Sequence, residues 1–457
     1  MSERFVVRTR TSPFPGLILA LLVVLSQGIL RLTTVPLWWH YDEPTHYEYM
    51  RYLVEHGKIP TGQQPDFAIL ERIAATFPEA IIANCYQIDT EGTPCVPIGH
   101  QFDEAPGYYL IQALFQRLLH PARINGQVWL ARIVSVLLAV GVGWLGYATA
   151  RDLFPEEPLL AAGVPLLLGL IGSYSDLMSA LNNDVGAVAG VSLFVYAMVR
   201  SLKRGLSPSN GLLLAVSLVA AWLTKSSARI ALPLAAIGLL LTFWPSLPLW
   251  GKVAGGVVGT VGLVWALHWE PGVGPLLRPA IDQVFPFGGI NQRLPFWYDQ
   301  QNWSYYGHAL RWQFVTFWSA FGYGVPGLPR GPLVVLSGLS GIAAVGVFKG
   351  WKQMRLSGWQ ARSLLFLAIV VSAALFMSFL RIDNPAPNSY VPTARHFFVA
   401  IIPVVIFLLA GWKAWLPART WKYGMAGIVL GLYGLDVWSI LTVQIPWFAA
   451  NWPIGFH

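Results

Sequence analysis

Residues 17–39 read LILALLVVLSQGILRLTTVPLWW, an apolar run with a single charged residue, Arg31. A helix of about 20 apolar residues spans the hydrocarbon core of a bilayer. Further apolar runs recur along the 457 residues, of which 55% are hydrophobic and only 11% charged. A soluble domain has about 25% charged residues. The sequence therefore predicts an all-α polytopic membrane protein.

About eleven transmembrane helices are expected when each such run is counted. The first is an uncleaved helix, because no small-residue cleavage site follows its apolar run. We expect one transmembrane domain over 1–457 and no separate soluble domain. The expected spans are 17–39, 129–149, 158–175, 185–200, 209–224, 228–245, 252–268, 331–348, 363–380, 396–412 and 424–443.

The basic residues indicate the orientation of these spans. If the spans alternate from a cytoplasmic N-terminus, the inside connections hold about half of the 30 Lys and Arg residues but few of the 22 acidic residues. Such an asymmetry follows the positive-inside rule. The net charge of +8 also lies in short clusters between apolar runs, which argues against nucleic acid as a partner. We expect a multi-pass protein of the plasma (inner) membrane.

Two large extracytoplasmic loops are expected, at 38–128 and 269–330. The first contains HYDEPTHYEYMRYLVEHGKIP and DEAPGYYLIQALFQRLL, which predict amphipathic juxtamembrane helices at the membrane surface. It also contains the two cysteines of the chain, Cys85 and Cys95. In an extracytoplasmic loop these two residues are expected to form a disulfide, with two free thiols as the alternative.

Acidic residues directly follow the first span. Asp42 and Glu43 precede Pro44, and His46 lies four residues after Asp42, on the same face of a helix. A carboxylate here could act as a general base or, with His46, bind a divalent metal such as Mg or Mn. The alternative interpretation is structural, because Asp42 also suits the N-cap of a short helix with Pro44 in its first turn.

Other polar residues are expected at the same outer face. Asn182, Asn183 and Asp184 form a turn between the third and fourth spans, where polar residues are ordinary. Asp176 lies near the end of an apolar helix, where a charge is costly and more suggestive of function.

Cations occur on this outer face, which the positive-inside rule otherwise depletes of them. Lys225 and Arg229 are four residues apart, a spacing that puts both on one helical face, and Arg395 with His396 enters the tenth span. Such cations suit a phosphate group. Snorkelling of long side chains to the interface is the alternative.

The order of these motifs resembles that of the GT-C superfamily of glycosyltransferases, which use polyprenyl-phosphate-linked sugars. YDEPTHYEYMRYLVEHGKIP, APGYYLIQAL, WLARIVSVLLAV, SALNNDVGA and TARHFFVAIIP carry the resemblance over most of the chain. APGYYLIQAL is similar to the PP-x-x-Y-type helix of protein mannosyltransferases and aminoarabinose transferases. Here DEAP replaces the double proline, which adds Asp103 and Glu104 to the acids near the site.

The resemblance implies an inverting transfer of a sugar from a polyprenyl-phosphate carrier to a lipid, glycan or protein acceptor at the extracytoplasmic face. Asp42 matches the acid that deprotonates the acceptor, and Glu43 and Asp184 are further catalytic candidates. Where a relative uses a metal, Asp42, Glu43 and His46 would bind it. The substrate-binding candidates are His46, Glu104, Tyr108, Asp176, Asn183, Lys225, Arg229, Arg395 and His396.

A lipid-linked-sugar flippase or transporter is the alternative function. Transporters often contain paired repeats and helices broken at the midplane of the membrane, and the sequence indicates neither. It also contains no Walker A or HExxH motif, which argues against ATP-driven transport and zinc proteolysis.

Overall fold

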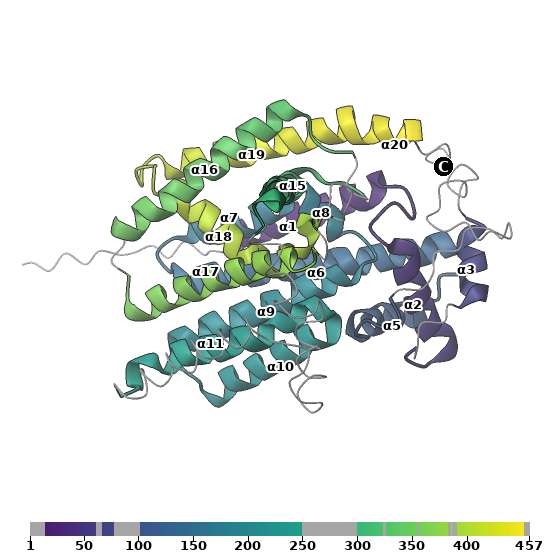
Figure 1. Cartoon of the computed structure of the whole chain (residues 1–457), viewed down its shortest axis with the longest axis horizontal. Coiled ribbons are helices and arrows are strands. Elements are labelled where there is room, and N and C mark those ends of the chain that lie inside the picture. Colours follow the sequence, from purple (N-terminus) through teal and green to yellow (C-terminus); the bar gives the residue numbers. More distant parts are fainter. Residues whose placement is uncertain are drawn as a thin grey trace, which may run out of the picture.

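The described part of the chain is helical throughout its regular structure. Figure 1 shows most helices running side by side along the long axis, with three short helices gathered at one end. These three are α2 (Glu43–His56), α3 (Phe67–Ala74) and α5 (Gly107–Leu119). The computed structural model describes residues 14–60, 66–76, 101–248, 299–322, 326–353, 356–382, 385 and 391–451.

Seven segments of the described residues are helical, long enough and apolar enough to cross a membrane, which confirms the multi-pass, all-α prediction. Three shorter apolar helices lie among them: α7 (Pro158–Leu170), α10 (Pro208–Thr224) and α18 (Ile401–Lys413), which follows η6 (Phe398–Ala400). The seven are α1 (Phe14–Thr34), α6 (Ile124–Leu153), α9 (Asn183–Arg204), η1–α11–η2 (Ser226–Ile230, Ala231–Phe243, Trp244–Ser246), α16 (Arg330–Gln353), α17 (Gly358–Phe379) and α19–η7–α20 (Trp421–Ser439, Ile440–Gln444, Ile445–Asn451).

Some expected features fall on residues outside the described part. These are the span 252–268, most of the loop 269–330, and the pair Cys85 and Cys95. The count of eleven spans and the disulfide therefore stay predictions. The described part of the second loop forms η4 (Gln300–Asn302) and α15 (Trp303–Ser319).

Two expected spans differ from the observed helices. The first helix ends at Thr34, before 39, because Pro36 lacks a backbone N–H and disfavours helical backbone at the residue before it. The expected span 158–175 is broken at Ile171, which is extended, and a short helix α8 (Gly172–Leu177) follows. A Cβ on Gly172 would lie only 2.9 Å from Nη2 of Arg31, so the break passes close to that buried guanidinium.

A buried ion pair joins the first and last described spans. Arg31 of α1 pairs with Asp436 of α19, and its Nη1 donates to Oε1 of Gln444 at 2.5 Å. Gln444 ends a π-helical turn, a helix irregularity that often occurs at functional sites. Charges at membrane depth are expensive unless they are paired, so this contact holds α19 against α1.

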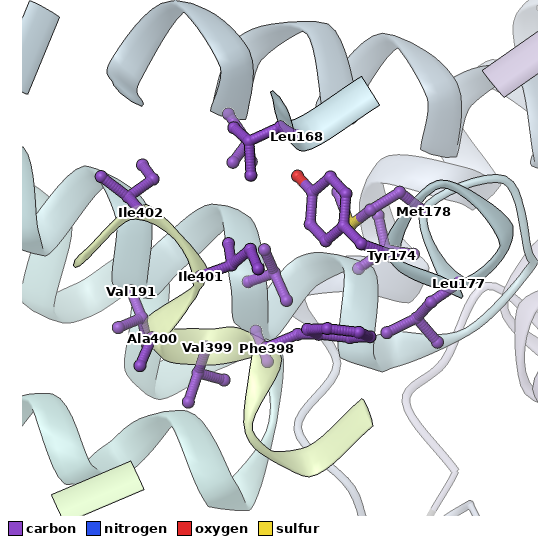
Figure 2. Packing of buried hydrophobic residues seen from close by; sticks show 14 of the residues in the cluster. Leu168, Tyr174, Leu177, Met178, Val191, Phe398, Val399, Ala400, Ile401 and Ile402 are labelled. Atoms are coloured by element: carbon purple, nitrogen blue, oxygen red, sulfur yellow. The ribbon is translucent and has the colours of Figure 1, made fainter. Parts of the chain in front are cut away.

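Apolar packing around α8 and η6 forms the core beneath the loop-bearing end. Figure 2 shows Tyr174 of α8 next to Phe398 of η6. Their ring centroids are 5.7 Å apart with an interplanar angle of 85°, an edge-to-face geometry. Tyr174 is 1% exposed and Phe398 is 2% exposed. This packing fixes the position of the segment just before α18. That segment carries the predicted site residues Arg395 and His396.

The expected inside connections meet at the opposite end of the bundle. Lys203 Nζ lies 2.7 Å from Oδ1 of Asp152, and Lys413 pairs with Glu157. Nε2 of Gln360 donates to the carbonyl of Leu153 at 2.8 Å. The contacts agree with the expected alternation of the spans, since they tie together the connections 150–157, 201–208, 349–362 and 413–423.

Candidate active site

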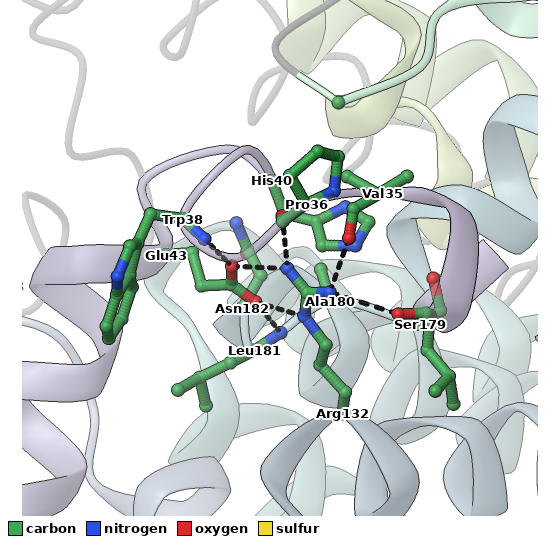
Figure 3. A network of polar contacts seen from close by, with 12 residues as sticks. Val35, Pro36, Trp38, His40, Glu43, Arg132, Ser179, Ala180, Leu181 and Asn182 are labelled. Atoms are coloured by element: carbon green, nitrogen blue, oxygen red, sulfur yellow. Dashed lines mark hydrogen bonds and ion pairs between the residues drawn. The ribbon is translucent and has the colours of Figure 1, made fainter. Parts of the chain in front are cut away.

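A buried Arg–Glu pair anchors the segment between α1 and α2. Arg132 of α6 donates from Nε to Oε1 of Glu43 at 2.8 Å and from Nη2 to Oε2 at 2.7 Å. The same guanidinium donates to the carbonyls of Leu32, Val35 and Pro36 at 2.8 to 3.1 Å. Figure 3 shows these groups converging on Arg132. The network fixes the backbone that carries Tyr41 and Asp42.

Glu43 is held by structural contacts in this geometry, which do not favour its predicted role as a catalytic acid. It is fully buried and accepts from the backbone N–H groups of Trp38 at 2.9 Å and Leu181 at 3.4 Å. Burial alone would raise its pKa, but the charge and hydrogen bonds of Arg132 outweigh burial and lower it. A carboxylate with both oxygens held in this way is unsuited to accept a proton from a substrate.

Asp42 has its carboxylate aimed at Arg395. The backbone of Asp42 is left-handed, with φ of 55°, and its side chain makes no capping hydrogen bond to α2. Nη1 of Arg395 instead donates to Oδ2 of Asp42 at 2.9 Å, and the guanidinium lies 4.3 Å from the ring centroid of Tyr41. Asp42 therefore occupies the N-cap position of α2, as the structural interpretation expected, but its side chain does not cap the helix, and Asp42 lies outside the helical face that carries His46. Left-handed backbone at a non-glycine residue is costly and is concentrated at functional sites.

A second acid–cation pair lies at the start of α9. Nζ of Lys225 is 2.9 Å from Oδ1 of Asp184 and donates to Oδ1 of Asn183 at 2.8 Å. Asn182 caps α9 by accepting from the N–H of Asp184, and its own amide donates to the carbonyl of Tyr41 at 2.8 Å. Asn182 therefore ties the Asp184 pair to the segment that carries Asp42.

His46 lies within electrostatic reach of both pairs. It is 1% exposed, and Nδ1 lies 2.7 Å from the hydroxyl of Tyr109. Burial lowers its pKa to about 3, and the charges of Asp42, Lys225, Asp184 and Arg395 modify this effect in opposite directions. His46 is therefore neutral near pH 7, so it offers hydrogen bonding and not positive charge.

Asp176 lines a small cavity beside Arg395. The wall of this cavity includes Tyr41, Thr393 and Arg395. Oδ2 of Asp176 accepts from the backbone N–H of Gly322 at 2.9 Å, and Nδ1 of His40 lies 3.5 Å away. The break before α8 gives Asp176 this position near the Asp42–Arg395 pair.

Four of the predicted substrate-binding residues lie outside the two acid–cation pairs: Arg229, Tyr108, Glu104 and His396. Arg229 lies in η1 with its guanidinium 4.7 Å from the ring centroid of Trp222. Lys225 is extended at the end of α10, so these two cations do not share one helical face as predicted.

Tyr108 and Glu104 make contacts that position the framework. Tyr108 is fully buried, with its hydroxyl 2.9 Å from Oγ of Ser135 and 3.1 Å from the backbone nitrogen of Asn182. Glu104 accepts from the backbone nitrogen of Ser226 at 3.0 Å. Tyr108 thus contacts the residue that caps α9, and Glu104 contacts the first residue of η1, directly after Lys225.

His396 lines a second small cavity, and Arg381 lines the same cavity. Burial, with the nearby charges of Arg381 and Arg395, lowers the pKa of His396 well below its ordinary value. This residue is therefore neutral at pH 7 and cannot act as a second cation beside Arg395.

The predicted metal ligands point to different partners. Asp42 contacts Arg395, Glu43 contacts Arg132 and His46 contacts Tyr109. Among the residues that the structure describes, no three His, Cys, Asp or Glu side chains form a group that could hold a metal ion. The geometry therefore gives no support to the set Asp42, Glu43 and His46 as a metal site.

Sequence reasoning missed several residues of this region. Arg132 gave a signal, since a charge within the apolar run WLARIVSVLLAV is expensive unless it is paired. Arg381 also lies on the face depleted of cations. Tyr109 and Thr393 lie in the motifs APGYYLIQAL and TARHFFVAIIP, but only the fold shows that they reach His46 and the Asp176 cavity.

Comparison with known families adds to this geometry. Residues 103–269 match the model of the family described as dolichyl-phosphate-mannose-protein mannosyltransferase. The match confirms the resemblance to GT-C glycosyltransferases. It covers less than half of the chain and includes Asp176, Asp184 and Lys225, but not Asp42 or Arg395.

A solved structure is similar to the chain as a whole. It is the crystal structure of ArnT from Cupriavidus metallidurans bound to undecaprenyl phosphate. The sequence identity is 17% and the TM-score is 0.45, over 90% of this chain and 62% of that chain. The chain thus spans less than two thirds of the length of ArnT. No curated protein is significantly similar to the chain.

Proposed function

We propose that the protein is an inverting GT-C glycosyltransferase that moves a sugar from a polyprenyl-phosphate carrier to an acceptor at the extracytoplasmic face of the plasma membrane. The observation that carries the proposal is the placement of two acid–cation pairs, Asp42–Arg395 and Asp184–Lys225, around His46. A donor of this class carries an anionic phosphate, which the cations of the two pairs can bind. The transfer also needs a base for the acceptor hydroxyl, and the acids of the two pairs can supply one.

Arg395 and Lys225 are the groups proposed to bind the phosphate. A guanidinium and an ammonium form charge-assisted hydrogen bonds with phosphate oxygens. They also neutralise the negative charge that grows on the leaving phosphate, and electrostatic stabilisation of this kind often contributes more to catalysis than any other effect. Arg395 is favoured over Arg229 because it lies directly against Asp42.

Asp42 is the proposed general base. In the reaction, the acceptor hydroxyl oxygen forms a bond with the anomeric carbon while the bond from that carbon to the phosphate oxygen breaks. The bonding electrons leave with the phosphate, and the acceptor proton passes to Asp42. The side chain of Asp42 is 39% exposed, more than that of Asp184 at 3%, so an acceptor can reach it.

Donor binding is proposed to activate Asp42. In the structure the carboxylate is paired with Arg395, which favours its ionised form and weakens it as a base. A phosphate that accepts hydrogen bonds from Arg395 would release the carboxylate of Asp42. The pKa of Asp42 would then rise toward the pKa of the acceptor hydroxyl, which makes Asp42 a stronger base. Asp184 stays paired with Lys225 and is proposed to hold that ammonium toward the phosphate.

The experiment that tests the activity is transfer of radiolabelled sugar by membranes that contain the protein. A panel of undecaprenyl-phosphate sugars serves as donors, and membranes without the protein are the control. The proposal predicts protein-dependent transfer from at least one donor to lipid, glycan or protein material. Movement of the same donors across liposomes without any transfer would contradict it and favour a flippase.

A further inference from the structure

We propose that Asp176 and Thr393 form a subsite for the hydroxyl groups of the donor's sugar ring, in the cavity that the phosphate-binding Arg395 also lines. This inference rests on the proposed function and deepens it, since it assigns the neutral part of the donor to the cavity between α8 and η5 (Ala394–His396).

Asp176 has one carboxylate oxygen committed and one available. Oδ2 accepts from the N–H of Gly322 at 2.9 Å and lies 3.5 Å from Nδ1 of His40. Oδ1 has no hydrogen-bond partner, although Asp176 is only 2% exposed. A buried carboxylate oxygen without a partner costs free energy, so its place in a cavity wall indicates a ligand that donates a hydrogen bond to it.

Thr393 adds a second polar group to the same wall. It occupies the N-cap position of η5, but its side chain makes no capping hydrogen bond, and its hydroxyl oxygen is buried without a partner. Two other hydroxyls in the wall already have partners: Ser173 donates to the carbonyl of Phe317, and Thr316 donates to the carbonyl of Trp312 at 2.7 Å. Asp176 and Thr393 therefore stand out as the groups that a ligand would satisfy.

Charge decides which part of the donor enters the cavity. A phosphate would be repelled by the carboxylate of Asp176, whereas it would be attracted by Arg395, another residue in the wall of the same cavity. A sugar hydroxyl can donate to Asp176 and either donate to or accept from Thr393. The phosphate is thus assigned to the side of Arg395 and Lys225, and the uncharged ring to the side of Asp176.

This arrangement makes the subsite selective for the sugar. A buried group that hydrogen-bonds a substrate hydroxyl strongly rejects an analogue without that hydroxyl, because the protein group is then left unpaired. The subsite is therefore expected to distinguish sugar-bearing lipids from bare undecaprenyl phosphate.

The test measures binding of two kinds of lipid to the full-length protein in nanodiscs. The probes are bare undecaprenyl phosphate and a panel of undecaprenyl-phosphate hexoses and pentoses. Asp176→Asn keeps the shape of the side chain and an oxygen for Gly322. This variant is expected to lower the affinity for the preferred sugar-bearing lipid by about tenfold or more. Bare undecaprenyl phosphate is expected to bind within about twofold of the wild-type affinity. Thr393→Val should change affinity in the same direction, by less.

Asp152→Asn is the matched control, since Asp152 is a paired carboxylate at the opposite end of the bundle. It should alter neither affinity. Unchanged sugar-lipid binding in Asp176→Asn, or an equal loss for both lipids, would overturn the subsite. A wild-type protein that binds every lipid of the panel equally would also overturn it, while its binding of bare undecaprenyl phosphate would leave the proposed function standing. An effect of Asp176→Asn on the acceptor's KM alone would reassign the cavity to the acceptor and overturn the inference.

Discussion

Nη1 of Arg395 lies 2.9 Å from Oδ2 of Asp42, although the two residues are 353 positions apart in the sequence. The pair joins the first loop to the segment before α18, and the Asp184–Lys225 pair lies within electrostatic reach of the same His46. In the proposed mechanism this contact between the base and the phosphate-binding cation is broken when the donor phosphate binds. This relationship makes the proposed mechanism testable at single residues.

Replacing Arg395 should weaken donor binding. Arg395→Gln removes the guanidinium while keeping a polar side chain, and we expect the dissociation constant for undecaprenyl phosphate to rise by about tenfold or more. Arg229→Gln is the control, because Arg229 packs on Trp222 and lies in a different element. Equal losses in the two variants would contradict the special role of Arg395.

Arg395 should also set the acidic limb of the pH profile. Partial burial raises the pKa of Asp42, but the charge and hydrogen bond of Arg395 outweigh burial and hold it below 3.8. The proposed base must be ionised, so activity is lost as the pH falls through this pKa. Removing the cation in Arg395→Gln raises the pKa, and the acidic limb of kcat/KM for the donor, which reports the free protein, should move to higher pH. A limb at the wild-type pH would contradict the assignment.

Breaking the Glu43–Arg132 pair should destabilise the fold. Glu43→Ala leaves a buried guanidinium without its carboxylate, a change that typically costs about 3–5 kcal/mol. We expect a large fall in the thermal midpoint of the protein in detergent. Glu55→Ala is the control, since Glu55 and its partners Arg51 and Arg72 all keep some exposure to solvent, and surface ion pairs contribute about 0–1 kcal/mol. Similar midpoints for the two variants would show that Glu43 is not the anchor.

The buried pair of Arg31 and Asp436 should behave as one unit. Asp436→Leu alone leaves the charge of Arg31 unpaired and is expected to lower the thermal midpoint strongly. The double variant Arg31→Met with Asp436→Leu removes both charges and should recover most of the loss, because an apolar pair of similar volume is often as stable as a buried ion pair. Additive losses in the double variant would mean that the two residues act independently.

The sequence predicted the helical membrane fold well because long apolar runs have few alternative structures in a bilayer. It also predicted that Asp42, Asp184, Lys225 and Arg395 share one face, since alternating spans bring every second connection to the same side. Which acid contacts which cation was not predictable, because these contacts depend on how the helices pack. Pattern alone therefore located the face of the site but not its pairs.

Three details of the site and the fold were not predicted from the sequence, each for its own physical reason. Asp42 and Glu43 are adjacent, and composition does not distinguish the acid buried against Arg132 from the acid aimed at Arg395. Gly172 lies within an apolar run that reads as one continuous span, and the run does not reveal that the guanidinium of Arg31 approaches the chain closely there. Arg132 was overlooked because its partner, Glu43, lies 89 positions away in the sequence.

The most direct test of the proposed mechanism compares wild-type protein with Asp42→Asn in a transfer assay, with donor binding measured in the same membranes. Asn keeps the size of the side chain but cannot accept the acceptor's proton as a base. We predict that transfer falls by about 100-fold or more while undecaprenyl-phosphate sugar still binds. Transfer at the wild-type rate in Asp42→Asn would remove Asp42 from the mechanism and contradict its role as the base.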